Sequence, residues 1–568
     1  MRVYEAIVKA LGSIGVGAAF GGAGENAAGM MIALKHSDQV RGIITRNEQA
    51  AAFAACGYAM FSDNLGFCFA TAGPGAFNLI SGLSVAQSDS YPVLAVSGYA
   101  NLAWRGKGSL NETSGLGRAP DSQAMMRATT KRTYLLQHPG ETIEVVEEAV
   151  NLAFAGRPGA VHIHVPENLT HADQQVDNYR DLRLDIRPVT PDPKDVKAAA
   201  ELLADALKRR QRVVLLAGWG SVRARAHDAV LRFVERFEIP VLTTLDGKGI
   251  IPESHRLAVG VFCDSGHKEA WRAFREADVV LAVGNSFAQH ATFNYRDDLF
   301  IDKKLVHLNI ERAEIDKVYR ADQPVVADAR LGITALHTAL DGLVGAQPQA
   351  AVARYVHAED RVLHPTRAKI HPGQMAQSIS RLLPERAIVL TDAGTHLAWL
   401  GYFLEVRRGQ HYRKPGAYGP MAGNTNGALG VKLAHPDRPV IVGCGDGCYL
   451  MSGFELTTAV EHQIPIIWII FNDNEYKLIK LYQLQEYRES GLVEFQNPDW
   501  AAYAEACGAV GFRVDTLEGF EQAFTAALAL NRPVLIDAHI TRLALPNYAP
   551  SPDGLLAGAV EQLMERLG

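Results

Sequence analysis

Two acidic residues follow two apolar runs in the last third of the chain, where they could hold a metal ion. Asp446 lies between Gly445 and Gly447 after the run PVIVGC, and Asp473 follows the run IPIIWIIFN. Parallel strands bring their carboxyl ends to the same edge of a sheet, so the two carboxylates can converge on one cation. Such oxygen ligands suit Mg²⁺, and the flanking glycines let a phosphate approach the backbone. The alternative is that both segments are ordinary turns at strand ends.

The elements that would position these residues are predicted by an alternation along almost the whole chain. Short runs rich in Val, Ile and Leu alternate with alanine-rich helical stretches, which is typical of βαβ units around buried parallel sheets. Two charged, proline-containing stretches, 177–195 and about 345–365, interrupt the alternation. An Arg-Pro turn leads into an apolar strand at both 156–168 and 531–541, a weak sign of a shared domain plan. We predict an α/β protein of three domains, each a doubly wound parallel sheet flanked by helices: 1–176, 192–345 and 366–568.

Composition excludes several classes of protein. The chain has 568 residues and a net charge of −6, with no basic block that would bind nucleic acid. Its 6 cysteines form no CxxC pair, which argues against a zinc site or a disulfide framework. No segment is apolar over the ~18 residues needed to cross a bilayer. We therefore expect a cytoplasmic protein without nucleic-acid or membrane partners.

The segment 439–474 resembles the thiamine diphosphate motif, in which Gly-Asp-Gly is followed by an Asn/Asp pair. The resemblance implies that Asp446, the Asp473 side chain and the backbone carbonyl of Glu475 hold Mg²⁺, which binds the diphosphate of the cofactor. It covers essentially the whole chain, so thiamine diphosphate and Mg²⁺ are the cofactors it implies. The cofactor-binding positions that it implies in the third domain are Gly394, Thr395, His396, Gly419, Met421, Gly445, Asp446, Gly447, Cys448, Asp473, Tyr476, Lys477 and Leu478.

Two of these positions also have structural explanations. The stretch VLTDAGTHLAW resembles the phosphate-gripping loop of the family, but His396 could instead pack in the core or cap the following helix. The stretch GAYGPMAGNTNGALG resembles the segment whose bulky apolar residue keeps the cofactor bent. Met421 matches that residue, although a lone methionine is more often part of a core.

In the first domain, the string NEQAAAFAACGYA resembles the family's activating-glutamate segment. The resemblance implies that Glu48 bonds the aminopyrimidine ring and so promotes loss of the proton from the thiazolium C2. The alternative is that Glu48 only stabilises a helix dipole. Pro74 and Asn78, in and after a Gly-Pro-Gly turn, match the loop that contacts the pyrimidine. Because the family places this glutamate and the diphosphate loop on different subunits, we expect a homodimer or homotetramer with active sites at the interface.

The match in the middle domain indicates the branch that contains acetolactate synthase, pyruvate oxidase and oxalyl-CoA decarboxylase, nearest to acetolactate synthase. This implies a decarboxylase or carboligase acting on a small-molecule 2-oxo acid. The alternative is a CoA-thioester lyase, such as a 2-hydroxyacyl-CoA lyase or oxalyl-CoA decarboxylase, and the tail 542–568 is less basic than such a lyase would require. A catalytically inactive regulatory subunit would be expected to lose Glu48 or Asp446, and both are present.

The expected substrate pocket departs from acetolactate synthases. Gly-Arg-Ala precedes Asp121 where those enzymes carry Phe-Gln-Glu, so Arg118 either binds an anionic substrate group or is a solvated surface residue. Glu25 either lines the pocket or caps a helix, and Gln483 is a third candidate substrate contact. The segment 282–295 lacks the Arg and paired acids of flavin-binding relatives, which argues against FAD.

Overall fold

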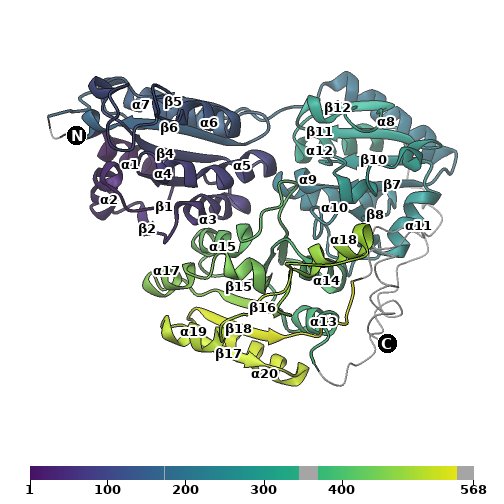
Figure 1. Cartoon of the computed structure of the whole chain (residues 1–568). Helices are drawn as coiled ribbons and strands as arrows, with labels where there is room; N and C mark the ends of the chain where they lie inside the picture. The colour runs from purple at the N-terminus through teal and green to yellow at the C-terminus, as the bar shows by residue number, and fades with distance from the viewer. Residues whose placement is uncertain (172, 345–368, 547–568) are drawn as a thin grey trace.

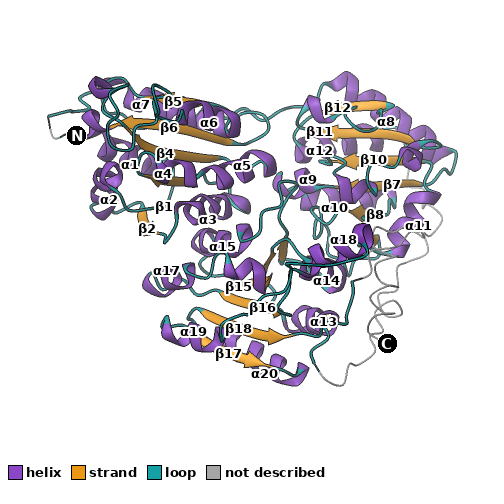
Figure 2. Cartoon of the chain, viewed as in Figure 1, coloured by secondary structure: helices purple, strands orange, loops and turns teal. Residues whose placement is uncertain are grey.

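The computed structural model describes residues 1–171, 173–344 and 369–546, and they form three six-stranded parallel sheets with helices packed against them (Figures 1 and 2). The predicted α/β class with three parallel sheets is therefore confirmed. The second predicted interruption, 345–365, lies outside the described residues, as does the tail from 547 onward on which the CoA argument depends. None of the described helices is long and apolar enough to span a bilayer.

The first sheet has the strand order β2-β1-β3-β4-β6-β5. Strands β3, β4 and β6 are buried along their whole length because helices cover both faces, which is why they read as apolar runs. Its strands are β1 (Ala18–Gly21), β2 (Arg41–Ile44), β3 (Gly66–Ala70), β4 (Val93–Tyr99), β5 (Thr133–Leu135) and β6 (Ala160–Pro166). Its helices are α1 (Val3–Ser13), η1 (Glu25–Ala27), α2 (Ala28–Lys35), α3 (Glu48–Met60), α4 (Pro74–Asn78), α5 (Ile80–Asp89), η2 (Leu102–Trp104), α6 (Ser122–Thr129), η3 (Pro139–Glu141), α7 (Thr142–Phe154) and η4 (Glu167–Thr170).

The third sheet repeats the topology of the first, in the order β14-β13-β15-β16-β18-β17. Counted within each domain, both orders are 2-1-3-4-6-5, so the shared plan suggested by the two Arg-Pro turns is confirmed. Its strands are β13 (Ile388–Thr391), β14 (His411–Arg413), β15 (Val440–Gly445), β16 (Ile467–Asn472), β17 (Val510–Val514) and β18 (Val534–His539). Its helices are α13 (Pro372–Leu382), α14 (Thr395–Phe403), α15 (Gly423–Ala434), α16 (Asp446–Leu450), α17 (Glu455–Glu461), α18 (Lys477–Tyr487), α19 (Trp500–Ala506) and α20 (Leu517–Ala529).

The middle sheet differs, with the order β12-β11-β10-β7-β8-β9. Its order reverses direction between β7 and β10, which is where open α/β sheets bind ligands. Its strands are β7 (Val213–Ala217), β8 (Val241–Thr243), β9 (Ala258–Val261), β10 (Val279–Val283), β11 (Lys304–Asn309) and β12 (Gln323–Val326). Its main helices are α8 (Pro193–Lys208), α9 (Trp219–Arg223), α10 (His227–Phe237), α11 (Lys268–Glu276) and α12 (Ala329–Asp341).

Helices α3 and α15 join the first and third domains, and Figure 1 shows α15 beneath α3. Glycines allow this close approach: a Cβ on Gly57 would lie 1.9 Å from the Gly427 carbonyl oxygen, and one on Gly430 would lie 1.8 Å from the Ala54 carbonyl oxygen. No larger residue fits at either position. The helix that begins with Glu48 is thus packed directly on a helix of the third domain.

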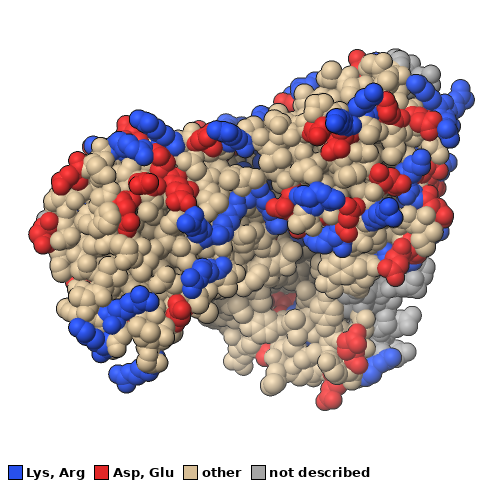
Figure 3. Space-filling view, turned by 90° about the horizontal axis from the view of Figure 1, so that it is seen from above, with Lys and Arg blue, Asp and Glu red and all other residues tan. Residues whose placement is uncertain are grey.

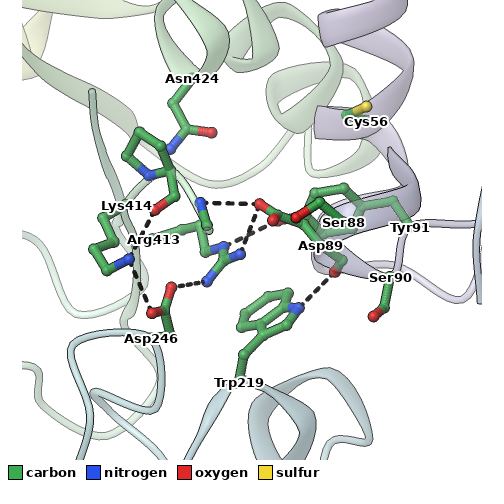
Figure 4. A network of polar contacts seen from close by, with 12 residues as sticks. Cys56, Ser88, Asp89, Ser90, Tyr91, Trp219, Asp246, Arg413, Lys414 and Asn424 are labelled. Atoms are coloured by element: carbon green, nitrogen blue, oxygen red, sulfur yellow. Dashed lines mark hydrogen bonds and ion pairs between the residues drawn. The ribbon is translucent and has the colours of Figure 1, made fainter. Parts of the chain in front are cut away.

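A buried ionic cluster joins all three domains (Figure 4). Arg413, at the end of β14, donates to Asp246 of the middle domain at 2.5 Å and to Asp89 of the first domain at 2.9 Å. Its guanidinium lies 3.8 Å from the ring centroid of Trp219, whose indole nitrogen donates to the Asp89 carbonyl at 2.8 Å. Asp89 also accepts from the backbone nitrogen of Gly416 at 3.0 Å, so the cluster anchors the segment that leads to Met421.

Candidate active site

Asp446 and Asp473 emerge from neighbouring parallel strands. Strands β15 and β16 are paired with Gly445 opposite Phe471, so both acidic residues follow at the carboxyl edge of the third sheet, as predicted. One Asp446 carboxylate oxygen accepts from the backbone nitrogen of Asn474 at 2.7 Å. This bond ties the turn after β15 to the turn after β16.

The two carboxylates lie in a buried setting that would favour a cation. Burial raises the pKa of Asp446 to about 6, and burial together with the charge of Asp446 raises the pKa of Asp473 to about 8. A divalent ion would relieve this repulsion and keep both groups ionised. Among the residues that the structure describes, no three His, Cys, Asp or Glu side chains are grouped to hold a metal. A metal site here therefore needs a third protein ligand other than a His, Cys, Asp or Glu side chain, such as the backbone carbonyl of Glu475.

Three glycines beside these acids lie against aromatic rings. A Cβ on Gly447 would lie 2.5 Å from the Tyr476 ring, and one on Gly445 would lie 3.1 Å from the His396 ring. Gly394 has φ +149°, and its Cβ would lie 2.5 Å from the same ring. A side chain at Gly447 or Gly394 would clash with one of these rings, and one at Gly445 would require the His396 ring to shift by a few tenths of an ångström. The bare backbone at such glycines allows close approach by a phosphate.

His396 lies beside two of these glycines with an unpaired nitrogen. It belongs to the first turn of α14, is 4% exposed, and burial lowers its pKa to about 4, so it is neutral. Its Nε2 has no hydrogen-bond partner among the described residues. The N-cap of α14 is Gly394, with no side-chain cap bond, so the capping interpretation of His396 is wrong. A buried, unpaired imidazole nitrogen beside the glycines is instead available to a bound ligand.

Asp392 holds the loop before His396, and sequence reasoning did not select it. Its buried carboxylate accepts from the backbone nitrogens of Asn424 at 2.9 Å and Thr425 at 3.0 Å, both in the first turn of α15. The Cys448 thiol donates to the Ala393 carbonyl at 3.2 Å. The loops that carry the candidate residues therefore support one another. The sequence signal that could have identified Asp392 was an acidic residue directly after a strand, in TDAGT.

Met421 lies just before α15 and is partly buried against the core shared by α3 and α15. Its Cε lies 3.3 Å from the place where a Cβ on Gly447 would stand, so it lies beside that glycine. Gly419, two residues earlier, is exposed and has φ +61°. The position of Met421 beside Gly447 fits the predicted apolar wedge as well as a core role.

The residues after Asp473 are fixed by a second buried ionic cluster. The Glu475 side chain is 0% exposed and pairs with Lys477, at the start of α18, and with Lys480 at 2.7 Å. Lys477 also donates to the Arg542 carbonyl. The ring of Tyr476 lies 4.7 Å from that of Phe495. The Lys477 ammonium is therefore already paired within the protein, whereas Leu478 beside it is partly exposed.

Asn497 was also missed, although it contacts the acid of the metal motif. Its side-chain nitrogen donates to Asp446 at 2.7 Å and to the Asn472 side chain at 2.9 Å. The Asn-Pro pair in FQNPDW was the only sequence signal, and it indicates a turn rather than a ligand contact.

Glu48 begins α3, as predicted, and lies beside the Gly-Pro-Gly turn. Its carboxylate accepts from the side-chain nitrogen of Asn78 at 2.9 Å. One carboxylate oxygen lies 2.6 Å from the place of a Cβ on Gly22 and 3.0 Å from the place of one on Gly75. Pro74 begins α4 and precedes Gly75 directly. The structure therefore brings Glu48, Asn78 and this turn together at the edge of the first sheet.

The Glu48 group and the Asp446 group are not joined by a hydrogen bond in the described part of one chain, although Glu455 of the third domain accepts from the backbone nitrogens of Arg46 and Asn47, just before Glu48. The contacts given above for Glu48 all lie in the first domain, and those of Asp446 all lie in the third. No hydrogen bond links Glu48 to Asp446 or Asp473 among the described residues, and Glu48 is partly exposed.

The three candidate substrate contacts lie apart from one another. Glu25 is exposed at the start of η1, where Gly24 is the N-cap and no side chain caps the helix, so the capping interpretation of Glu25 is wrong. Arg118 is exposed in a turn closed by a backbone bond from Gly115 to Pro120 at 3.1 Å. The Gln483 amide both donates to and accepts from the Gly491 backbone at 3.1 Å. No hydrogen bond joins any two of the three in the described part of the chain.

A cavity of about 480 Å³ lies where the first, middle and third domains meet. Basic side chains gather along the groove between the first and middle domains (Figure 3). The cavity lining includes Arg157, Arg223, Arg225, Arg330, Gly218 and Gly284. The expectation that the protein uses no FAD concerns this region and stays a prediction.

Comparison with protein families identifies all three domains. Residues 1–122 match the N-terminal TPP binding domain of thiamine pyrophosphate enzymes, residues 200–336 match their central domain, and residues 392–538 match their C-terminal TPP binding domain. Thiamine pyrophosphate is another name for thiamine diphosphate. The matches thus cover the parts of the chain that hold Glu48 and Asp446.

Curated relatives match the chain over nearly its whole length. It is 32% identical to a probable acetolactate synthase large subunit of Methanocaldococcus jannaschii, over 99% of this chain and 96% of the relative. It is 29% identical to a probable acetolactate synthase large subunit of Methanococcus aeolicus, over 100% and 96% respectively. It is 30% identical to the acetolactate synthase large subunit of Corynebacterium glutamicum, over 94% and 86%. The protein therefore belongs to the thiamine diphosphate-dependent enzymes and is an acetolactate synthase-like enzyme that acts on carbon–carbon bonds.

Proposed function

We propose that the protein is a thiamine diphosphate- and Mg²⁺-dependent decarboxylase or carboligase that acts on a 2-oxo acid. The observation that carries this proposal is the pairing of Glu48 with Asn78 at a glycine-lined turn, together with two buried carboxylates at the edge of the third sheet. When bound, the cofactor supplies a C2 nucleophile that takes the acyl group of a 2-oxo acid with loss of CO₂ and passes it to an acceptor.

Third-domain residues would contact the diphosphate end of the cofactor, and Glu48 would contact its aminopyrimidine end. Asp446, Asp473 and the Glu475 carbonyl would hold Mg²⁺ against the diphosphate, and His396 beside Gly394 would contact the same end. Met421 would support the bent form of the cofactor. Glu48, oriented by Asn78 at 2.9 Å, would hold a proton at the aminopyrimidine ring and so assist removal of the C2 proton.

The active unit that we propose is a cytoplasmic homodimer or homotetramer, in which Glu48 of one subunit meets Asp446 of another. Support comes from the absence of a hydrogen bond between the two groups in the described part of one chain and from exposed apolar side chains in the first and third domains. Leu110 is 78% exposed in the first domain, and Met451 and Phe454, just after α16, are 54% and 70% exposed. Exposed apolar side chains of this kind can contribute to a subunit interface. The same proposal divides each subunit into domains 1–176, 192–345 and 366–568.

A direct test incubates the protein with thiamine diphosphate, Mg²⁺ and a panel of 2-oxo acids and acyl-CoA thioesters. Release of CO₂ and the coupled products are followed by mass spectrometry, with Glu48→Gln as the matched control. Turnover of a 2-oxo acid that depends on Glu48 is the expected result. Turnover of acyl-CoA thioesters alone would replace the proposal with a CoA-thioester lyase.

A further inference from the structure

A buried glutamate holds the long loop between β4 and α6 in one shape. Glu112 is 7% exposed, and its carboxylate accepts from the backbone nitrogens of Gly108 at 2.7 Å and Ser109 at 3.1 Å, and from that of Gly106. It also accepts from the Ser114 hydroxyl at 2.6 Å. Charge-assisted bonds of this kind are stronger than neutral ones, and four of them turn residues 106–114 around a single side chain. We call this segment the Glu112 turn.

The far end of the Glu112 turn is attached to the core of the first domain. The Thr113 hydroxyl lies 2.7 Å from that of Ser122, at the start of α6, and the Ser122 hydroxyl lies 3.3 Å from Nε2 of His164. His164 is a buried residue of β6. The turn is therefore built onto the sheet rather than being a free surface loop.

The Glu112 turn places Asn111 against the Gly-Pro-Gly turn. Asn111 has the left-handed φ of +56°, and its Cβ and Cα lie 3.0 and 3.3 Å from the place of a Cβ on Gly73. Two residues on, the place of a Cβ on Gly75 lies 3.0 Å from a carboxylate oxygen of Glu48. Asn111 is partly exposed, and its amide makes no hydrogen bond with any described residue. Asn111, with its unpaired amide, thus lies beside the turn that begins α4, the helix that ends with Asn78, the hydrogen-bond partner of Glu48.

We propose that Asn111 is a substrate-positioning residue, whose amide donates a hydrogen bond to the carboxylate or carbonyl oxygen of the 2-oxo acid, and that Glu112 acts through it by holding its backbone. This inference rests on the proposed function. It adds a substrate-recognition residue to the candidate Arg118, which lies exposed in the next turn of the same loop.

The test compares Asn111→Gly, Asn111→Asp and Glu112→Gln in the enzyme loaded with thiamine diphosphate and Mg²⁺. Glycine keeps the left-handed backbone and removes the amide, whereas aspartate keeps the shape and adds a charge that repels an anionic substrate. Asn294→Gly is the matched control, because Asn294 is an exposed asparagine of φ +63° in the middle domain. The readouts are kcat and KM for the 2-oxo acid that the wild type uses best, and proton exchange at the cofactor C2 without substrate.

One lost hydrogen bond corresponds to about a tenfold loss in kcat/KM, so Asn111→Gly should lose about tenfold and Asn111→Asp about a hundredfold, mainly through KM. Glu112→Gln should resemble Asn111→Gly, and Asn294→Gly should match the wild type. C2 proton exchange should stay within about twofold of the wild type in Asn111→Gly, because Asn111 acts on the substrate.

Two results would overturn this inference while leaving the proposed function intact. One is wild-type kcat/KM in both Asn111 variants. The other is a loss of C2 exchange in Asn111→Gly equal to its loss of turnover, which would indicate a structural role. A wild-type enzyme that exchanges the C2 proton but uses no 2-oxo acid would refute the proposed function, and this inference with it. If Glu112→Gln does not fold, the two Asn111 variants still decide.

Discussion

Replacing Arg413 with methionine should destabilise the protein in a pH-dependent way. The Arg413 side chain is 1% exposed and contacts two acids of two other domains. Asp246 keeps a second partner, Lys414 at 2.9 Å, after the substitution. Asp89 keeps no ion-pair partner in direct contact: it retains the hydrogen bond from the Gly416 backbone nitrogen and the more distant charge of Lys414. Because burial raises the pKa of Asp89 even beside Arg413, its carboxylate should become protonated in the variant.

The size of the effect follows from the cost of that protonation. With an unfolded pKa of about 3.9 and about 1.36 kcal/mol per pH unit, holding one carboxylate protonated costs at most about 4 kcal/mol at pH 7 and about 1.5 kcal/mol at pH 5. Breaking a buried pair costs about 3–5 kcal/mol, which agrees with the value at pH 7. The pKa of Asp89 is higher in the folded variant than in the unfolded chain, so the folded state binds this proton more tightly. The loss of stability therefore grows as pH rises from 5 to 7.

The assay is urea-induced unfolding at pH 7 and pH 5, with the free energy taken from the first transition. Arg256→Met is the matched control, because Arg256 pairs with Glu238 at the surface, with side chains 52% and 30% exposed. Such a pair contributes about 1 kcal/mol or less. The reasoning is refuted if Arg413→Met costs no more than Arg256→Met at pH 7, or if its cost is the same at both pH values.

Four further substitutions test the site. Glu48→Gln should slow C2 proton exchange by about 10²–10⁴-fold while the cofactor still binds, and unchanged exchange measured by NMR would remove Glu48 from the activating role. Asp446→Ala should abolish Mg²⁺-dependent cofactor retention in calorimetry, whereas Asp473→Asn should be milder because an amide oxygen can still coordinate; equal losses would contradict the proposed ligand set. Arg118→Gln should raise KM for an anionic substrate about ten- to a hundredfold in steady-state assays, and wild-type kinetics would leave Arg118 a solvated surface residue.

The sequence predicted the sheets and the acidic residues at their edges, because both depend on neighbouring residues. A buried parallel strand must be a continuous apolar run, and a phosphate-binding turn after it must contain glycine. Asp446 after β15, Asp473 after β16 and Glu48 at the start of α3 follow from such local patterns, and the structure places all three where the patterns predicted. The strand orders did not follow, since an apolar run does not specify which strand it pairs with.

Other features were decided only by tertiary structure. Asp392 is recognisable as a support only because the first turn of α15 reaches it, and Arg413 because Asp89 and Asp246 come from two other domains. Asn111 is placed beside the Glu48 half of the site only because the Glu112 turn folds onto Gly73. A single polar residue has little local signature, and its partners lie tens to hundreds of positions away. The sequence by itself therefore determined the elements and the cofactor motif, whereas the packing of the three domains decided which polar side chains meet.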